Sequence, residues 1–184
     1  GPDPEPPSEY GRTKGLGEQA VRDAFPKATI IRPSVVFGPE DNFTNPFAGV
    51  SGYSVLPVFA PKTSFQPILV RDLGQAIAPA VLDPRSHGGK IYELGGPDVL
   101  TMHELCGEIA RLSGQSPDLV DMADFMGSMV ASFGFLPGAP LTRDQWIMLQ
   151  KDNVPSGKHG GLKAFGITPT PMSSVAPEWL GRYR

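Results

Sequence analysis

A tyrosine and a lysine four residues apart are the side chains in this sequence whose types and spacing best suit catalysis. Tyr10 and Lys14 lie in a helix-like segment, where this spacing puts both on one face with about 5–6 Å between Cβ atoms. An ammonium stabilises a phenolate, so the pair could exchange a proton with a carbonyl or hydroxyl group and hold ribose hydroxyls. The alternative is structural: the tyrosine packs on a sheet and the lysine pairs with Glu18.

A second candidate segment, with the sequence RPSVVFGP, runs over residues 32–39 and follows a predicted strand. Ligands of open parallel sheets bind beyond the carboxyl ends of the strands. Ser34 offers a hydroxyl there, and the next backbone amides offer hydrogen-bond donors. The alternative is an ordinary strand exit marked by Pro33 and Gly38.

Hydrophobic periodicity predicts the elements that must position these residues. Apolar residues at spacings of three and four predict helices over 8–25, from residue 72 onward, and over 101–112, 122–133, 142–149 and 178–182. Short apolar or β-branched runs predict strands at 28–32, 55–59, 68–70 and 90–94. Capping boxes are expected to begin helices at Asp72, Thr101 and Thr142, and Pro79 is expected to kink or end its helix early.

The order of these elements predicts an α/β fold. Strands alternate with helices in the first half, which is typical of a parallel sheet. Beyond Pro117 the pattern changes to helices and loops, which indicates a mostly helical cap beside the sheet. No stretch of the chain reaches 18 uninterrupted apolar residues, so no transmembrane segment is expected.

Composition and isolated motifs exclude several classes of function. The net charge of −3, without a run of like charges, argues against nucleic acid as a partner. A single cysteine, Cys106, excludes an intrachain disulfide and a cysteine-held metal cluster and fits a reducing, cytoplasmic location. His103 lies three residues before it but lacks a third ligand nearby, so no metal site is expected. The methionine-rich stretch 122–130 is interpreted as core, with a pocket for an apolar substrate or contact with a membrane surface as alternatives.

Taken together, the motifs resemble the second half of an extended or atypical short-chain dehydrogenase/reductase, of the NAD-dependent epimerase/dehydratase type. The resemblance rests on Tyr10 and Lys14 in a helix, the following strand with RPSVVFGP, and the segments FQPILVRDL (65–73) and YELGGP (92–97). Within that family the chain resembles bacterial relatives of the nucleotide-binding accessory subunit of respiratory complex I. The segments LTRDQ (141–145), KDNV (151–154) and GITPT (166–170) carry this second likeness.

The resemblance implies a role for each candidate residue. Tyr10 would be the catalytic acid/base and Lys14 its ribose-holding partner, and both would contact the cofactor, NAD or NADP. The residues that would line the nicotinamide are Pro33, Ser34 and Val36, and those that would face the substrate are Phe37 and Gln66. The implied domains are a leader or break point (1–7), a Rossmann-like remainder (8–38 and 65–95) and a substrate-binding cap (39–64 and 96–184).

The chain departs from the family pattern at its start. No glycine-rich turn that could hold a pyrophosphate follows an apolar strand, and no room precedes Tyr10 for the Ser or Thr that completes the family triad. We therefore expect an N-terminal phosphate-binding half to be absent, dinucleotide binding by this chain alone to be weak or absent, and the chain alone to be inactive. An unpaired sheet edge would then favour a homodimer or another partner chain.

Three hypotheses of function remain, and in the last of them the chain is only an interaction module whose exposed sheet edge pairs with a second copy. In the first, the full-length parent is an NAD(P)-binding oxidoreductase that acts on a carbonyl, hydroxyl or quinone-like substrate. In the second, the protein is a non-catalytic nucleotide-binding accessory protein of a respiratory complex, peripheral to the inner membrane. A Ser or Thr near Tyr10 on an upstream strand would favour the first, and an aliphatic residue there the second.

Overall fold

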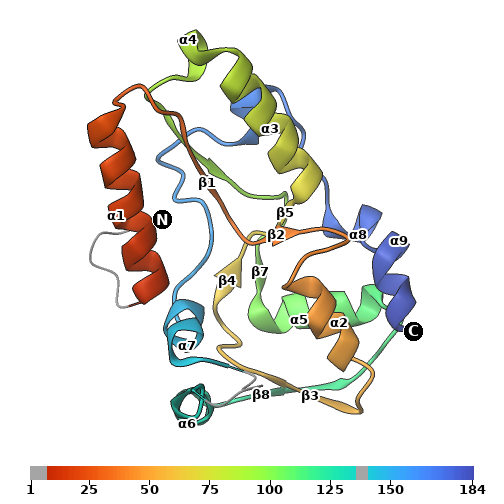
Figure 1. The fold of residues 1–184 in the computed structure, drawn as a ribbon. Coiled ribbons are helices and arrows are strands. Elements are labelled where there is room, and N and C mark those ends of the chain that lie inside the picture. The colour runs from red at the N-terminus through yellow and green to blue at the C-terminus, as the bar shows by residue number, and fades with distance from the viewer. Residues whose placement is uncertain (1–7, 136–140) are drawn as a thin grey trace.

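The computed structural model describes residues 8–135 and 141–184, which form an α/β protein (Figure 1). The α-helices within these residues are α1 (Glu9–Ala24), α2 (Thr44–Val50), α3 (Val70–Leu82), α4 (Pro84–His87), α5 (Met102–Leu112), α6 (Asp124–Ser132), α7 (Arg143–Leu149), α8 (Met172–Val175) and α9 (Pro177–Leu180). Two 3₁₀-helices, η1 (Leu162–Phe165) and η2 (Gly181–Tyr183), lie near the end of the chain. The strands are β1 (Ile30–Pro33), β2 (Val36–Phe37), β3 (Val55–Val58), β4 (Ser64–Phe65), β5 (Ile68–Leu69), β6 (Ile91–Leu94), β7 (Leu100–Thr101) and β8 (Asp118–Asp121).

Strands β1 and β6 form the parallel pair that organises the first half of the chain. Ile31 lies opposite Tyr92, and Arg32 lies opposite Glu93. Because successive side chains of a strand point to opposite faces, these two pairs lie on different faces of the sheet. Ile31 and Tyr92 pack in the apolar cluster that also holds residues of α3 and η1. Arg32 and Glu93 face the other way, and Arg32 contacts Glu18 of α1, so α1 and α3 lie on opposite faces.

Helix α1 runs alongside β1 in the opposite direction (Figure 1). It begins after Ser8, whose Oγ accepts a hydrogen bond from the Gly11 amide, and ends before Pro26, as the sequence predicts. Glu18, in the middle of the helix, is hydrogen-bonded to Arg32 of β1. Tyr10 lies eight residues before Glu18, which is about 12 Å along a helix. The first turn of α1 therefore extends beyond the carboxyl end of β1.

Two of the three predicted capping boxes are confirmed. The Thr101 side chain accepts from the Glu104 amide and begins α5, and Thr142 does the same with Gln145 and begins α7. In both boxes the side chain three positions on accepts a hydrogen bond from the threonine amide. The strand pairs β1–β6 and β2–β5 are both parallel, which confirms the predicted parallel α/β class.

The helix start expected at Asp72 and the early end expected at Pro79 were wrong, while the kink given as the alternative stays a prediction. The helix begins at Val70 directly after β5, so Asp72 lies within its first turn. The Asp72 carboxylate is 3% exposed and accepts hydrogen bonds from the Thr170 amide and hydroxyl, at 2.7 and 3.0 Å. Pro79 lies inside the helix, which continues to Leu82. A proline removes only one hydrogen bond of its helix, and the neighbouring turns carry α3 onward.

The second half of the chain contains more strand than the sequence predicts. β8 pairs in parallel with β3, with Leu119 opposite Leu56. The pattern of β8 is mostly exposed and polar, so it lacks the apolar alternation by which strands are recognised. Buried side chains of β3 and α5 nevertheless join one large apolar cluster with Phe37. No helix in the described part of the chain is long and apolar enough to cross a membrane.

Candidate functional site

The Tyr10–Lys14 pair forms at the N-terminal end of α1. The Lys14 ammonium lies 5.5 Å from the centroid of the Tyr10 ring, which confirms the predicted shared face. The structural alternative was wrong on both points. Tyr10 is 54% exposed and not packed on the sheet, and Glu18 pairs with Arg32 and Arg22 and not with Lys14. Both side chains are therefore accessible to a ligand, while their catalytic roles stay predictions.

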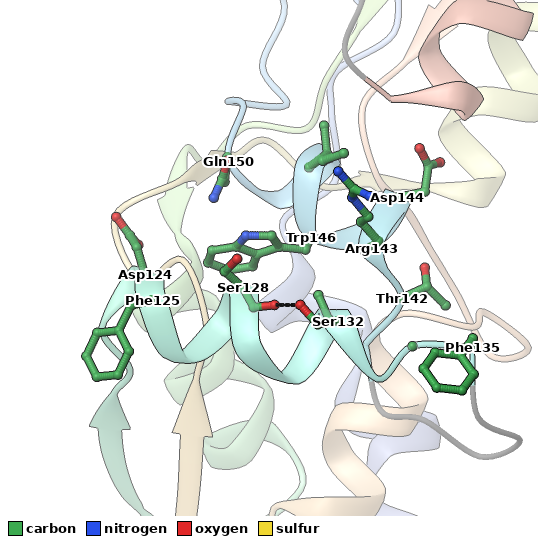
Figure 2. A pocket seen from close by; sticks show the side chains of 13 residues that line it. Asp124, Phe125, Ser128, Ser132, Phe135, Thr142, Arg143, Asp144, Trp146 and Gln150 are labelled. Carbon is green, nitrogen blue, oxygen red and sulfur yellow. Dashed lines mark hydrogen bonds between the residues drawn. The ribbon is translucent and has the colours of Figure 1, made fainter.

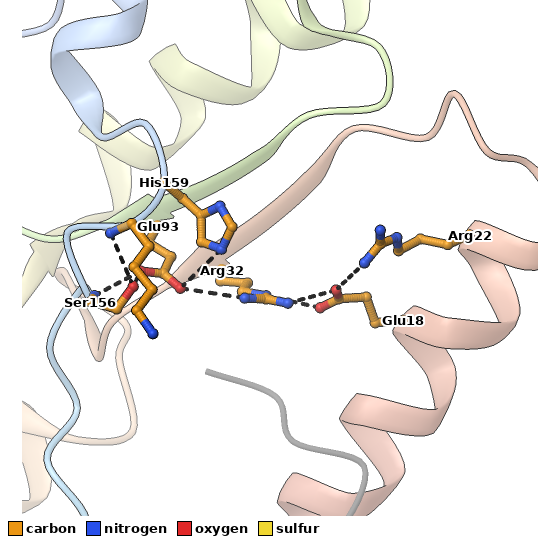
Figure 3. A network of polar contacts seen from close by, with 7 residues as sticks. Glu18, Arg22, Arg32, Glu93, Ser156 and His159 are labelled. Atoms are coloured by element: carbon orange, nitrogen blue, oxygen red, sulfur yellow. Dashed lines mark hydrogen bonds and ion pairs between the residues drawn. The ribbon is translucent and has the colours of Figure 1, made fainter.

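A polar network fastens the middle of α1 to the sheet (Figure 3). Arg32 donates to both carboxylate oxygens of Glu18, at 2.9 and 2.7 Å, and to Glu93 at 3.3 Å. Hydrogen bonding to Glu18 raises the pKa of Arg32, although partial burial acts against this. The guanidinium thus joins one carboxylate of α1 to one carboxylate of β6. This contact fixes where α1 lies along the direction of β1.

Glu93 is the buried end of this network. Its Oε2 accepts from the amide and the hydroxyl of Ser156, at 2.7 and 2.6 Å, and His159 Nε2 lies 4.0 Å from Oε1. Burial alone would raise the pKa of Glu93, but the Ser156 hydrogen bonds, with His159 and Arg32, hold it below its ordinary value. Glu93 therefore stays charged and ties the C-terminal segment to the same face of the sheet.

The turn after β1 has its hydrogen-bond donors engaged inside the protein. The Ser34 amide donates to the Leu94 carbonyl at 2.8 Å, and its hydroxyl lies 2.6 Å from two oxygens of Asn153. The Val35 amide donates to Asn153 Oδ1 at 2.8 Å. Among the residues expected to line a nicotinamide, Ser34 is thus buried in this contact, Val36 is half-buried and Pro33 is exposed. Asn153 was missed as a site residue, although the KDNV segment around it was noted.

The two residues expected to face a substrate are held within the fold. Phe37 is 1% exposed in the main apolar cluster, with its ring centroid 6.5 Å from that of Trp179. The Gln66 side-chain amide donates to the Gly96 carbonyl at 2.7 Å. Their roles toward a substrate stay predictions, and the structure gives each of them a packing or hydrogen-bonding role.

An open groove lies between α6 and α7 (Figure 2), and one residue of its lining, Asp144, contacts the start of α1. Its volume is about 1090 Å³, and the described residues that line it include Phe125, Ser128, Trp146 and Gln150. Asp144, at one end of the groove, accepts hydrogen bonds from the Glu9 and Tyr10 amides, at 2.6 and 3.2 Å. One residue of the groove lining therefore contacts the backbone of Tyr10, a connection that the sequence did not indicate.

The features set aside in the sequence have structural roles. His103 Nδ1 lies 2.6 Å from Asp121 Oδ1, so this ring joins α5 to the end of β8. Burial raises the pKa of the Cys106 thiol to about 12. In the described part of the chain no three potential ligands gather into a metal site. The interpretation of the methionine-rich stretch 122–130 as core was wrong, because Gly127 is its one buried residue and Phe125 and Met129 are exposed. Phe125 lines the groove.

Helices on both faces of a parallel strand pair, with the Tyr10–Lys14 pair beyond a strand's carboxyl end, define a Rossmann-like α/β protein. The chain belongs to the family described as the RmlD substrate binding domain, whose model matches residues 2–126.

Curated relatives match nearly the whole chain. The NADH dehydrogenase [ubiquinone] 1 alpha subcomplex subunit 9, mitochondrial, of Arabidopsis thaliana is 46% identical over 97% of this chain and 47% of its own length. The protein of the same name from Mus musculus is 33% identical over 94% of this chain and 47% of its own length. The ceramide reductase of Caulobacter vibrioides is 32% identical over 95% of this chain and 53% of its own length. The chain thus spans about half the length of these relatives.

Solved structures share the fold at lower sequence identity. The UDP-glucose 4-epimerase of Thermus thermophilus, in complex with NAD, has a TM-score of 0.61 and 18% identity, over 100% of this chain and 59% of its own. The dTDP-4-dehydrorhamnose reductase of Bacillus anthracis, in complex with NADP, has a TM-score of 0.64 and 19% identity, over 95% of this chain and 54% of its own. At such identities the comparison shows the fold alone.

Proposed function

We propose that this chain forms the nicotinamide-facing wall and the substrate cap of an NAD(P)-dependent oxidoreductase, with Tyr10 as acid/base and Lys14 as its partner. The observation that carries the proposal is the exposed Tyr10–Lys14 contact at the end of α1 that extends beyond β1. The names of solved neighbours, which include complexes with NAD and NADP, support the cofactor class.

The residues present fit the ribose and nicotinamide end of a dinucleotide. The phenol and the ammonium are both accessible donors, and the exposed ring of Pro33 offers an apolar surface at the end of β1. The amides of Ser34 and Val35 are already engaged, so Tyr10 and Lys14 carry the polar contacts. The pyrophosphate would need other residues, because this sequence has no glycine-rich turn after an apolar strand, the element that binds a pyrophosphate in such proteins.

The chemistry follows from the pair. A bound reduced dinucleotide supplies a hydride to a carbonyl carbon of the substrate. Tyr10 donates its phenolic proton to the carbonyl oxygen, and the Lys14 ammonium stabilises the phenolate that remains until it is protonated again by water. In the reverse direction the phenolate accepts the proton of a hydroxyl group.

The groove between α6 and α7 is our candidate for the substrate's binding surface. It ends at Asp144, which contacts the backbone of Tyr10, and it carries the aromatic side chains of Phe125 and Trp146. A substrate with an apolar portion, including a quinone-like one, would match this lining. The named ceramide reductase among the relatives supports an apolar carbonyl or alcohol as the class.

A second candidate function is nucleotide binding without turnover, in an accessory subunit peripheral to a respiratory membrane complex. The 46% identity to a named NADH dehydrogenase subunit favours it. Both candidates share the dinucleotide site, and both leave one edge of β1 for a partner, since β1 pairs only with β6 within the described residues. That partner could be another part of a longer protein or a second copy in a homodimer.

The experiment that tests the shared site is a titration of the isotope-labelled chain with NADH and with NADPH, followed by NMR. We expect weak binding that shifts the resonances of Tyr10, Lys14 and Pro33. Lys14→Met should reduce the affinity, whereas Lys163→Met, a matched change at an exposed lysine of η1, should leave it unchanged. Absence of any response to either dinucleotide, both in this chain and in a protein of the relatives' full length, would refute the site.

Turnover separates the two candidates once binding is established. With a reduced dinucleotide and carbonyl or quinone acceptors, the oxidoreductase hypothesis expects oxidation that Tyr10→Phe abolishes while dinucleotide binding persists. Binding without turnover in a protein of the relatives' full length would favour the accessory role.

A further inference from the structure

The segment 142–153, which comprises α7 and the residues 150–153 that follow it, contacts both parts of the proposed site. Asp144 near its start reaches α1 at Tyr10, and Asn153 at its end reaches the turn after β1. We propose that Asp144 and Asn153 are positioning residues that fix Tyr10 and the 33–36 turn relative to each other. This inference rests on the proposed function, because it assigns a purpose to the same site.

At one end, Asp144 caps a helix that lies far away in the sequence. Its two carboxylate oxygens accept from the amides of Glu9 and Tyr10, at 2.6 and 3.2 Å. The next two amides of α1, those of Gly11 and Arg12, donate to the side chain and carbonyl of Ser8. The bond from Arg12 is the first regular bond of the helix, and the amides of Glu9, Tyr10 and Gly11, which have no carbonyl partner within it, are satisfied by the two side chains. A carboxylate at this place also complements the helix dipole.

Helix α1 depends on such polar contacts because apolar packing holds it weakly. Gly15 is the only buried residue of this helix, while Leu16 and Val21 are each 48% exposed. Apart from the Arg32 contacts at mid-helix, the Asp144 contact is what ties the first turn to the described remainder of the chain. Loss of Asp144 would therefore release the turn that carries Tyr10.

At the other end, Asn153 joins the turn after β1 to the loop before β5. Its Oδ1 accepts from the Val35 amide and lies 2.6 Å from Ser34 Oγ, and its carbonyl accepts from the Gln66 amide at 3.2 Å. Its own amide donates to the Ser64 carbonyl at 2.8 Å. In the described part of the chain its side-chain nitrogen donates to nothing, so the side chain serves only as an acceptor.

Packing and hydrogen bonds hold α7, and with it the Asp144 and Asn153 contacts, in place. Trp146 is 5% exposed in an apolar cluster, the Thr142 capping box closes the helix start, and the Leu149 carbonyl accepts from Thr63 Oγ1 at 2.6 Å. The same helix lines the groove that we assign to the substrate. The segment thereby sets the distance between the proposed proton donor, the nicotinamide surface and the substrate groove.

The test compares alanine variants within the segment. Asp144→Ala and Asn153→Ala remove the contacts to the site. Their matched controls are Gln145→Ala, which removes a capping contact of the same helix, and Asp152→Ala, which removes only the bond from the Ser64 amide. NADH affinity is measured by NMR titration, and hydrogen exchange is measured at the amides of Tyr10 and Val35.

We expect each site variant to weaken NADH affinity on the order of tenfold, because a displacement of about 1 Å by a distant change is enough for losses of this size or more. The controls should bind NADH like the unchanged chain. Asn153→Asp, which keeps the acceptor oxygens, should restore binding relative to Asn153→Ala. Exchange should accelerate at Tyr10 in Asp144→Ala and at Val35 in Asn153→Ala.

Equal losses of affinity in site variants and controls would overturn the proposal, since they would indicate a general contribution to folding. If neither the unchanged chain nor a protein of the relatives' full length binds a dinucleotide, the proposed function fails, and the exchange rates alone decide the positioning. Acceleration confined to the site variants would then support it, and uniform rates across all the variants would refute it.

Discussion

Replacement of Arg32 tests whether a polar contact, and not apolar packing, holds α1 on the sheet. Arg32→Met keeps an unbranched chain but removes the bidentate contact to Glu18 and the bond to Glu93. Hydrogen bonds to charged groups contribute about 1.5–3 kcal/mol. The Arg32 side chain is 19% exposed, so water replaces part of this, and we expect a loss of about 2 kcal/mol.

For a chain of this size, such a loss lowers the midpoint of thermal unfolding by about 4–8 °C. Differential scanning calorimetry measures this midpoint. Arg32→Lys keeps the charge but loses the planar fork of donors, so its midpoint should lie between those of the unchanged chain and Arg32→Met. Arg12→Met is the control, because it breaks an exposed pair with Glu9 in the same helix and should leave the midpoint unchanged. Equal midpoints for Arg32→Met and Arg12→Met would refute the reasoning.

Three further predictions concern packing and titration. Gly127→Ala should destabilise the chain by about 1–3 kcal/mol, because the added Cβ would overlap the Trp146 ring. Gly74→Ala, in an open helical position, should stabilise the chain by about 0.5–1 kcal/mol. Urea unfolding measures both changes. Cys106, whose pKa burial raises to about 12, should resist iodoacetamide in the native protein at neutral pH and react after unfolding, and rapid native labelling followed by mass spectrometry would contradict its burial. The pKa of Glu93 is lowered on folding, so the stability that its carboxylate contributes is complete above the ordinary value of 4.5 and is lost as the pH falls through the lower folded value. Below pH 4.5 the urea midpoint should therefore fall less steeply with pH in Glu93→Gln than in the unchanged chain. Parallel curves for the two proteins would argue against this role.

Local sequence signals predicted the parts of the fold that local physics determines. The helix over 8–25 and the capping boxes at Thr101 and Thr142 follow from side chains that satisfy nearby amides. Long-range contacts defeated the same reasoning elsewhere. Asp72 looked like a helix cap, but its carboxylate binds Thr170, which lies 98 residues away in the chain.

The candidate site was predicted in its chemistry but not in its support. The Tyr10–Lys14 contact follows from helical spacing alone. Asp144 and Arg32 hold the helix that carries this pair, and Asn153 holds the turn after β1. Asp144 and Asn153 lie more than a hundred residues away from Tyr10 and Val35, respectively. Periodicity cannot predict such contacts, because it reports the face of an element and not its neighbour in space.

The central claim is that the Tyr10 face of α1 receives the nicotinamide ring, and a transferred nuclear Overhauser experiment with NADH tests it most directly. Magnetisation should pass between the Tyr10 ring protons and the C4 protons of the nicotinamide, and it should disappear in Tyr10→Ala. Transfer to NADH only from residues of the α6–α7 groove, with none from Tyr10, would contradict the claim.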